Sequence, residues 1–312
     1  MGLVTMTAVD PGNACGGPQA RKASGMLQKI TVLTVGITVA VAPVCAAQQN
    51  EPGGKLLLTR GISTLEGAGG GALTPWALIT GNETDRGIGA SAHYSYVTVE
   101  DFGVESLGGA VGLYDRFEVS YSRMTFDTRE AGAALGLGEG FEFAQDIWGA
   151  KLRVAGDAVY GQDTWLPQIA LGAEYKQSNR DGLVQALGAD DDKGVDFYAS
   201  ATKLFLAESL LANATLRYTK AHQTGLLGFG DEATVQPEFS LGYMLSRRLI
   251  VGGEYRFKPD ELAFAAEDDF FDIFGAYAVN PNLTLTAGYA DLGSVALFEK
   301  QRGLYLSAQI GF

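Results

Sequence analysis

The chain has 312 residues, of which 42 are glycine and 19% are charged, and its formal net charge is −13. So acidic a protein is a poor partner for nucleic acid. The glycines follow no three-residue period, which excludes collagen, and a chain with 10% aromatic residues does not have the composition of a disordered protein. Many glycines and aromatic residues with few charges fit a closed β-sheet, in which residues pack closely.

Residues 1–47 have the features of a secretory signal peptide. Arg21, Lys22 and Lys29 precede an apolar run from Ile30 to Val41, and small residues follow it as far as Ala47. This order of basic, apolar and small residues is typical of a cleaved signal. The apolar run is too short to cross a bilayer as a helix. We therefore predict an exported protein that is cleaved after residue 47.

Cleavage at this position changes the chemistry of the chain. Both cysteines, Cys15 and Cys45, are removed, so the mature protein has no thiol. Three basic residues and one acidic residue are also removed, so the net charge becomes −15. Two alternatives stay open. Translation starts at Met1 or at Met26, and a lipid anchor on Cys45 is disfavoured because Val44 stands where a smaller residue is expected.

Residues 48–87 form a glycine-rich segment with two possible structures. Lys55–Gly81 could form a hairpin that adds two strands to the sheet that follows. It could instead fold inside that sheet as a plug, where glycines permit close approach of the backbone. Pro75, which lacks a hydrogen-bond donor, and Trp76–Ile79, which is apolar on both faces, favour the plug. The tight connection Asn82–Gly87 favours the hairpin.

From Ile88 to the C-terminus, segments of about ten residues alternate between apolar and polar side chains. Leu211–Thr219 and Leu249–Phe257 are clear examples. A period of two is that of a β-strand with one apolar face. A soluble sandwich turns this face inward, whereas a membrane barrel turns it toward lipid. Alternation alone does not distinguish the two folds.

The connections between the strands do distinguish them, because short turns alternate with long loops. This asymmetry is typical of outer-membrane barrels. Residues 88–312 then give 12 strands, or 14 with the hairpin, so we predict an all-β, transmembrane, antiparallel up-and-down β-barrel. The expected short turns are Asp115–Arg116, Ala155–Thr164, the region of Glu208, Ser246–Arg248 and Asn280–Asn282. The expected long loops are Asp127–Ala144, Ser178–Lys193, Lys220–Glu232, Pro259–Asp269 and Leu292–Arg302.

The C-terminus has the pattern of a strand up to its last residue. Leu304, Leu306, Ala308, Ile310 and Phe312 share one face. We expect this strand to pair with the first one, because a closed wall leaves no unpaired edge in lipid. Ile310 and Phe312 also resemble the C-terminal signal that the bacterial barrel assembly machinery recognises. Ser307 departs from that signal, which often has glycine at this position.

Two stretches, Gly53–Gly81 and Gly112–Asp127, resemble an uncharacterised family of Gram-negative outer-membrane barrels that is described as a domain of unknown function. The resemblance covers nearly all of the mature chain. It implies a porin-like barrel in the cell outer membrane, surrounded by lipid and lipopolysaccharide. It implies no activity.

The sequence predicts no catalytic, cofactor or metal site. Gly67–Gly71 lacks the lysine and hydroxyl group of a phosphate-binding loop. His93 lies on the polar face of its strand, which fits a lumen-lining residue better than a phospholipase centre. Asp190–Asp192 and Glu267–Asp272 are rich in the oxygen ligands of Ca²⁺ and Mg²⁺, but they have no EF-hand spacing, so we favour solvated acidic loops.

Charged residues on the polar faces are expected to line the lumen. They could act on small polar solutes as a selectivity field, or they could pair and seal the barrel. We predict a porin-like channel for passive diffusion of small solutes and not an enzyme. The alternatives are a plugged carrier of hydrophobic substrates, as in the fatty-acid channel family, and a non-conducting structural or adhesion barrel. The predicted lumen residues are Glu118, Lys151, Arg153, Glu174, Lys176, Asp196, Arg217, Glu238, Glu254 and Arg256.

Overall fold

The computed structural model describes residues 55–60, 62–186, 189–258, 268–295 and 297–312. The predicted signal peptide lies outside these residues, and so does most of the acidic loop that follows residue 258. Among the described residues, no helix is both long enough and apolar enough to cross a membrane.

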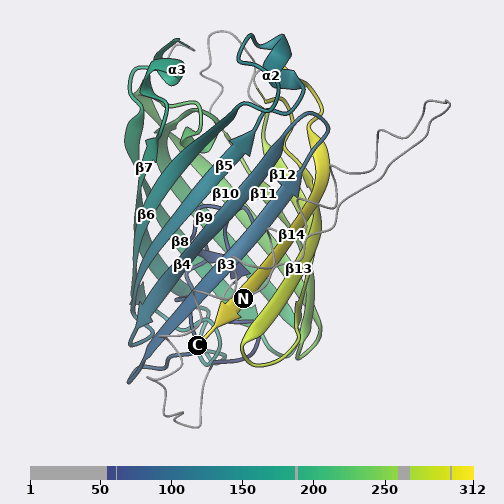
Figure 1. Cartoon of the computed structure of the whole chain (residues 1–312). Helices are drawn as coiled ribbons and strands as arrows, with labels where there is room; N and C mark the ends of the chain where they lie inside the picture. Colours follow the sequence, from purple (N-terminus) through teal and green to yellow (C-terminus); the bar gives the residue numbers. More distant parts are fainter. Residues whose placement is uncertain (1–54, 61, 187–188, 259–267, 296) are drawn as a thin grey trace, which may run out of the picture. The chain divides into compact units, whose positions relative to one another are not determined.

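In the described part of the chain, 12 strands form one closed antiparallel barrel, as predicted (Figure 1). Each strand pairs with its neighbour in the sequence, and the last strand pairs with the first. The strands are β3 (Ile88–Thr98), β4 (Gly103–Leu113), β5 (Phe117–Asp127), β6 (Glu142–Ala155), β7 (Gln168–Ser178), β8 (Lys193–Phe205), β9 (Leu210–Ala221), β10 (Phe229–Ser246), β11 (Leu249–Arg256), β12 (Phe270–Ala278), β13 (Leu283–Asp291) and β14 (Arg302–Gly311).

The C-terminal strand closes the wall. Its register with β3 runs from Leu304 opposite Thr98 to Gly311 opposite Ser91. Beyond β14, Phe312 donates its N–H to the carbonyl of Ala90 at 2.8 Å and accepts the N–H of the same residue at 3.0 Å. The pairing therefore extends to the last residue and leaves no open edge. Recognition of Phe312 and Ile310 by an assembly machinery stays a prediction.

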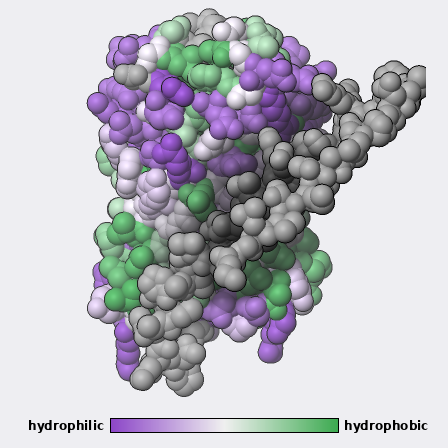
Figure 2. Space-filling view, in the orientation of Figure 1, coloured by the Kyte–Doolittle hydropathy of each residue, from purple (hydrophilic) through white to green (hydrophobic). Residues whose placement is uncertain are grey.

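The outer surface is apolar along the strands. Leu107 and Leu216 are 63% and 57% exposed, and most other large outward side chains are apolar as well. On the face in view, Figure 2 shows hydrophobic side chains in the lower part of the barrel and mostly hydrophilic ones in its upper part, with a further hydrophobic patch at the long-loop end. Tyr121, Trp148 and Tyr175 form an outward row with ring centroids 5.6 and 5.7 Å apart. This inside-out arrangement with aromatic rows is that of a barrel in lipid.

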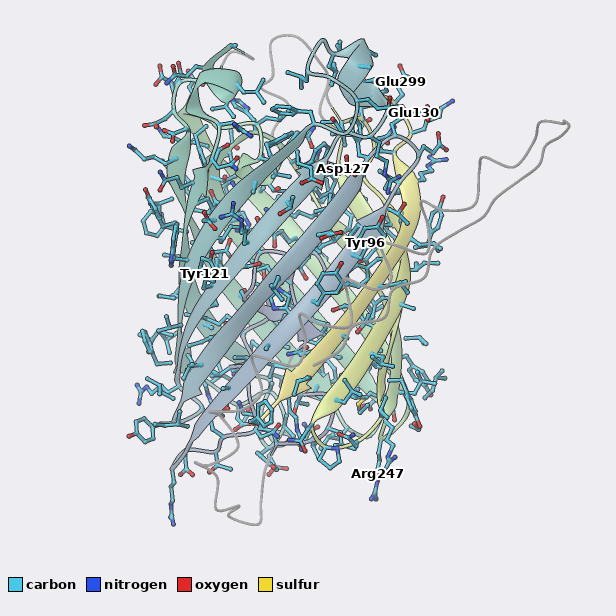
Figure 3. All side chains as sticks on the ribbon, viewed as in Figure 1. Tyr96, Tyr121, Asp127, Glu130, Arg247 and Glu299 are labelled. Atoms are coloured by element: carbon cyan, nitrogen blue, oxygen red, sulfur yellow. The ribbon has the colours of Figure 1, made fainter. Side chains whose placement is uncertain are left out.

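Short and long connections occupy opposite ends of the barrel. The long-loop end carries α2 (Ala131–Ala134), α3 (Asp181–Ala186) and η2 (His222–Gly225). Figure 3 shows Glu130 and Glu299 at this end and Arg247 at the short-turn end. Two connections depart from this pattern. The four residues 99–102 between β3 and β4 form a short turn at the long-loop end, and the 12 residues 156–167 between β6 and β7 form a long connection at the short-turn end.

We call residues 55–87 the plug, because most of the described residues in this range lie inside the barrel rather than in its wall; Leu56, Asp85 and Arg86 are exposed. Two very short strands, β1 (Ile62–Ser63) and β2 (Gly69–Gly70), pair with each other and not with the barrel. Trp76 has no exposed surface. A wall of 14 strands, which was the alternative prediction for Lys55–Gly81, is therefore wrong.

The inner face of the wall is polar only at mid-height. Near the short turns, Leu204 and Ile250 pack with Trp76 of the plug. Near the long loops, Val97, Phe126 and their neighbours form a second apolar cluster. The inward side chains are apolar at these two ends, because they meet the plug and the loops instead of water.

Candidate functional site

The contact between the wall and the plug is the most distinctive polar feature of the lumen. Glu118 accepts the N–H groups of Gly69 at 3.0 Å and Thr80 at 2.8 Å. Lys151 donates to the carbonyls of Gly69 at 2.7 Å and Leu78 at 3.0 Å, and it pairs with Glu118 at 3.0 Å. This ion pair therefore holds the main chain of the plug rather than lining a passage.

Uncharged side chains of the wall hold the next part of the plug. Ser200 and Thr215 donate to the carbonyl of Pro75 at 3.0 and 2.8 Å. The N–H of Ala77 donates to the hydroxyl of Thr202 at 2.7 Å. Buried main-chain groups need such partners, and the plug, which is nearly devoid of strand pairing, obtains them from the wall.

Glu254 of β11 forms a third anchor. One oxygen accepts the N–H of Leu73 at 2.7 Å, and the other accepts the hydroxyls of Thr74 and Ser240, both at 2.7 Å. The plug backbone comes so close that a Cβ at Gly71 would lie 1.8 Å from this carboxylate. A side chain at this position would therefore displace Glu254 from its contacts with the plug.

Glu66 is the central charge of the plug. It pairs with Lys176, with Arg256 at 2.7 Å and with Arg217 at 3.4 Å. Burial alone would raise the pKa of Glu66, but the charges of Arg256, Lys176 and Arg217 hold that pKa well below its usual range. Glu66 is thus ionised and bound by three bases of the wall.

The wall also supplies acids for these bases. Arg217 contacts Glu238 at 2.6 Å and Glu174 at 2.7 Å, and Lys176 contacts Asp196 at 2.7 Å. We call the six wall residues the charged belt. Three bases face three acids, so the belt is balanced without Glu66. Its members are Glu174, Lys176, Asp196, Arg217, Glu238 and Arg256, and each side chain is at most 6% exposed.

Oxygens of Glu66, Glu174 and Asp196 lie within 4.8 Å of one another, a spacing that would suit a metal ion. Lys176 contacts all three of these residues, and Arg217 does so too. Because the negative charge already has cationic partners, the geometry is that of an ion-pair network.

Nine of the ten predicted lumen residues are buried inside the barrel, and Arg153 is the exception. It lies at the short-turn end, where it pairs with Asp115 and, at 3.1 Å, with Asp157. The prediction that Glu267–Asp272 is one acidic loop is wrong for Asp272, which is a buried residue of β12. The alternation of Asp272 with outward Phe271 and Ile273 is a signal that could have identified it.

Sequence reasoning missed Glu66, because the plug has no strand period that would assign its side chains to a face. His222, in the expected long loop Lys220–Glu232, is buried at the long-loop end of the barrel.

His93 is the residue nearest to hydrolytic chemistry. Its Nε2 lies 3.2 Å from the hydroxyl of Ser106, and both residues are buried. Among the described residues, none forms a hydrogen bond with its Nδ1, so the third group of a catalytic triad is missing from this geometry. Ser106 also donates to the carbonyl of Leu65 at 2.6 Å. The pair therefore supports the plug.

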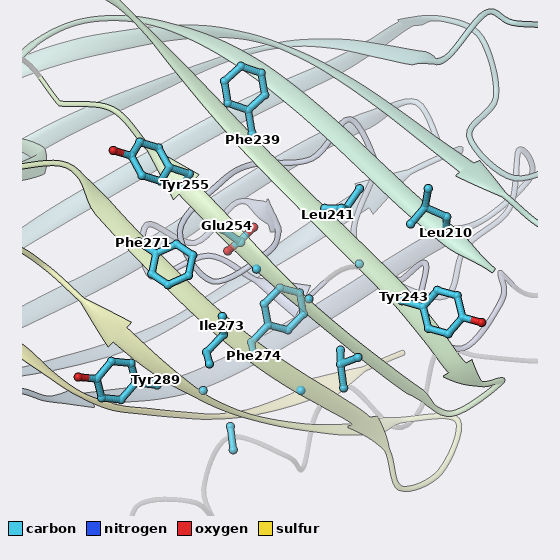
Figure 4. Close-up of a pocket in the computed structure, with 17 residues that line it drawn as sticks. Leu210, Phe239, Leu241, Tyr243, Glu254, Tyr255, Phe271, Ile273, Phe274 and Tyr289 are labelled. Carbon is cyan, nitrogen blue, oxygen red and sulfur yellow. The ribbon is translucent and has the colours of Figure 1, made fainter. Parts of the chain in front are cut away.

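Two hollows flank these anchors. A cavity of about 60 Å³ lies inside the barrel between the plug and the long loops. A larger groove of about 910 Å³ runs over the outer face of β10–β13 (Figure 4). Phe274 lies behind this groove, and a Cβ at Gly252 would come within 2.9 Å of its ring. The groove is thus part of the lipid-facing surface of the wall. It is hollow because glycines, which make room for Phe274, have no side chains to fill it.

The family model described as "Protein of unknown function (DUF3034)" matches residues 59–309. A comparison with curated proteins found no match. Among solved structures, a KdgM porin in complex with disordered oligogalacturonate is 10% identical, with a TM-score of 0.47 and coverage of 71% of this chain and 99% of that one. The NanC porin is 11% identical, with a TM-score of 0.45 and coverage of 71% and 97%. Outer membrane phospholipase A from Escherichia coli is 8% identical, with a TM-score of 0.42 and coverage of 70% and 92%. Similarities at this level carry no argument about function.

Proposed function

The chain belongs to the DUF3034 family of proteins of unknown function, and we propose that it is an outer-membrane, porin-like channel that its own plug closes. In this proposal, small molecules pass through the barrel when residues 55–87 leave the lumen. The apolar exterior and the predicted signal peptide support a position in the outer membrane. Contacts with lipopolysaccharide and with the assembly machinery are part of the same proposal.

The observation that carries the proposal is the polarity of the contact between plug and wall at mid-height of the barrel. Glu118, Lys151 and Glu254 hold the plug by hydrogen bonds to its main chain or hydroxyls. Because these bonds involve charged side chains, water can replace them at a net cost of about 1.5–3 kcal/mol each. A dry apolar contact would lose about 25 cal/mol for every Å² exposed. A polar contact is thus suited to a plug that must be released.

The charged belt supports the same conclusion. Without Glu66, its three bases still face three acids, with Arg217 between Glu174 and Glu238. An isolated buried charge is very unfavourable, but the departure of the plug would leave none on the belt. The wall is therefore prepared for both the closed and the open state.

Conductance in planar bilayers tests the proposal. A variant that lacks Lys55–Gly81 should fold, as judged by its heat-modifiable migration in gels, and should stay open. The wild-type protein should be mostly closed under the same conditions. A folded deletion variant without conductance would refute the channel and favour the structural or adhesion barrel.

A second candidate function, transport of hydrophobic molecules, is favoured by the apolar cavity beside the plug. It differs from the first only in the solute that the channel accepts.

A further inference from the structure

The cavity of about 60 Å³ lies where three parts of the barrel meet. The plug contributes Leu73, the wall contributes aromatic rings, and the segment after η2 contributes two leucines. The lining is mostly hydrocarbon, and its polar members are Glu66, Gln223, Thr224 and Arg256. The residues that define its apolar character are Leu73, Phe126, Phe143, Phe270, Leu226 and Leu227.

This hollow is larger than an ordinary packing defect. Protein interiors contain few voids bigger than one water molecule, and a single water needs only about 10–15 Å³. A mostly hydrocarbon lining gives water few partners, and apolar cavities stay dry. The space therefore suits an apolar occupant better than solvent.

The charges beside the cavity are already engaged. Glu66 and Arg256 line it and pair with each other at 2.7 Å. Arg256 also donates to the carbonyl of Leu73 at 3.4 Å. An ionic head group would have to break this pair, whereas an uncharged molecule would leave it intact.

The route from the long-loop end also selects by charge. Glu130, Glu139, Glu142, Asp190 and Asp191 are all exposed there. Their field repels anions within a Debye length of about 10 Å at 0.1 M salt. Cations are attracted to the mouth, but they would lose their hydration in a hydrocarbon cavity. Uncharged hydrophobic molecules meet neither barrier.

The segment that bears the two leucines has an unusual backbone. Gln223 and Thr224 have φ values of 45° and 63°, and Gly225 and Gly228 also have positive φ. A positive φ is a genuine outlier for a β-branched residue such as Thr224. Strain of this kind is concentrated at ligand sites and moving segments. Displacement of Leu226 and Leu227 would enlarge the cavity toward the roughly 150 Å³ that holds benzene in another protein.

We infer that this cavity binds an uncharged hydrophobic small molecule, of about the size of one aromatic ring, on its way through the barrel. The passage rests on the proposed channel function, but the binding does not.

The test uses fluorobenzene as the probe and ¹⁹F NMR as the readout, with the mature protein in lipid nanodiscs. Nanodiscs without protein correct for partition into lipid. Val104→Phe fills the cavity, since Val104 lines it and is 5% exposed. Val111→Phe is the matched control, because Val111 lies on the same strand but faces outward, where it is 42% exposed. Both variants are first checked for heat-modifiable migration.

Wild-type protein and Val111→Phe should show saturable binding, and Val104→Phe should bind at least tenfold more weakly. The anion 4-fluorobenzoate should bind at least tenfold more weakly than fluorobenzene at 0.1 M salt. Absence of saturable binding to the wild type, equal binding by Val104→Phe, or preference for the anion would overturn the inference. If the wild type binds fluorobenzene but the plug-deletion variant does not conduct, the channel function is refuted and the cavity site stands. If the plug-deletion variant conducts but the wild type does not bind fluorobenzene, the cavity site is refuted and the channel function stands.

Discussion

The wall and the plug are held in place by different physical means. The wall is a continuous ladder of main-chain hydrogen bonds that closes between β14 and β3. The plug has only the two-residue strands β1 and β2, and its other polar groups depend largely on side chains of the wall. The wall would therefore survive removal of the plug, whereas the plug has no comparable structure without the wall.

If the plug closes the channel, as proposed, the folding stability of the wall and the position of the plug depend on different residues. Substitutions on the outer face should change folding, and substitutions at the anchors should change the position of the plug. The following changes test that separation in order of expected effect.

Removal of the central plug charge should have the largest effect. Glu66→Ala breaks contacts with Lys176, Arg217 and Arg256. A hydrogen bond between charged groups contributes about 1.5–3 kcal/mol, so the loss of even one of these contacts should change the closing equilibrium at least tenfold. We expect frequent openings in planar bilayers with an unchanged wall. Glu142→Ala, at an exposed carboxylate of the long-loop end, is the control. If both variants behaved like the wild type, Glu66 would not hold the plug.

Two adjacent residues of β9 should separate folding from gating. Leu216 faces outward, and Thr215 donates to the carbonyl of Pro75 in the plug. Leu216→Arg should lower the free energy of unfolding in bilayers by about 2–4 kcal/mol, because it places a charge in lipid. Thr215→Arg should affect folding less but should displace the plug and raise conductance. Equal losses of folding stability with no change in conductance would contradict the comparison.

The link between plug and wall should depend on pH. Glu83 is buried, accepts a hydrogen bond from Lys55 at 2.9 Å, and lies near Asp115. Burial raises the pKa of Glu83 to about 7, because Lys55 offsets only part of the effect. A released plug would expose Glu83 and return its pKa to about 4.5. Protonated Glu83 therefore favours the bound plug. This contribution to the free energy of plug binding, roughly 3 kcal/mol, is complete below about pH 4.5 and is lost as the pH rises through 7.

Trp76 is the reporter for this prediction, because the other two tryptophans, Trp148 and Trp165, are exposed on the outside and can be replaced by Phe. In that background, the emission of Trp76 should shift to the red between pH 5 and pH 8. The additional change Glu83→Gln should abolish the shift. The same pH profile in both proteins would rule out this role of Glu83.

The acidic loops should have the smallest effect. In an opened variant such as Glu66→Ala, the belt is balanced, so the loops should give a modest preference for cations. Asparagine at Asp190, Asp191 and Asp192 together should weaken this preference at 0.1 M salt. It should have little effect at 1 M, where the Debye length is only about 3 Å. Reversal potentials across a potassium chloride gradient measure this, and a preference for anions would contradict the proposed role of the loops.

The sequence predicts the wall well and the plug poorly, for physical reasons. Alternation such as that of Leu211–Thr219 reports which face of a strand meets lipid, and closure requires a paired terminal strand. Strand period does not explain why Val97, Phe126 and Ile250 are apolar, because their inward contacts are with the plug and loops. An early sign was available, since Leu249–Val251 is apolar on both faces.

The contacts of the plug could not be predicted in the same way. Glu118 and Lys151 were assigned to the lumen from strand period, but their partners are main-chain groups of Gly69, Leu78 and Thr80. Every residue has the same main-chain carbonyl and nearly every residue the same N–H, so the sequence does not show which of these groups a side chain binds. The alternation of a strand predicts which way a side chain points but not its interaction partner.

The most direct test of a movable plug is a reversible disulfide between plug and wall. The hydroxyls of Thr74 in the plug and Ser240 in β10 are in hydrogen-bond contact, so cysteines at both positions should be close enough to pair. Both native cysteines, Cys15 and Cys45, lie in the predicted signal peptide, and no other thiol would interfere in the mature chain. The double variant Thr74→Cys and Ser240→Cys is compared with each single variant, all in the Glu66→Ala background. The account predicts that oxidation abolishes conductance in the double variant alone and that a reductant restores it. Equal conductance with the disulfide formed and reduced would show that solutes do not depend on movement of the plug.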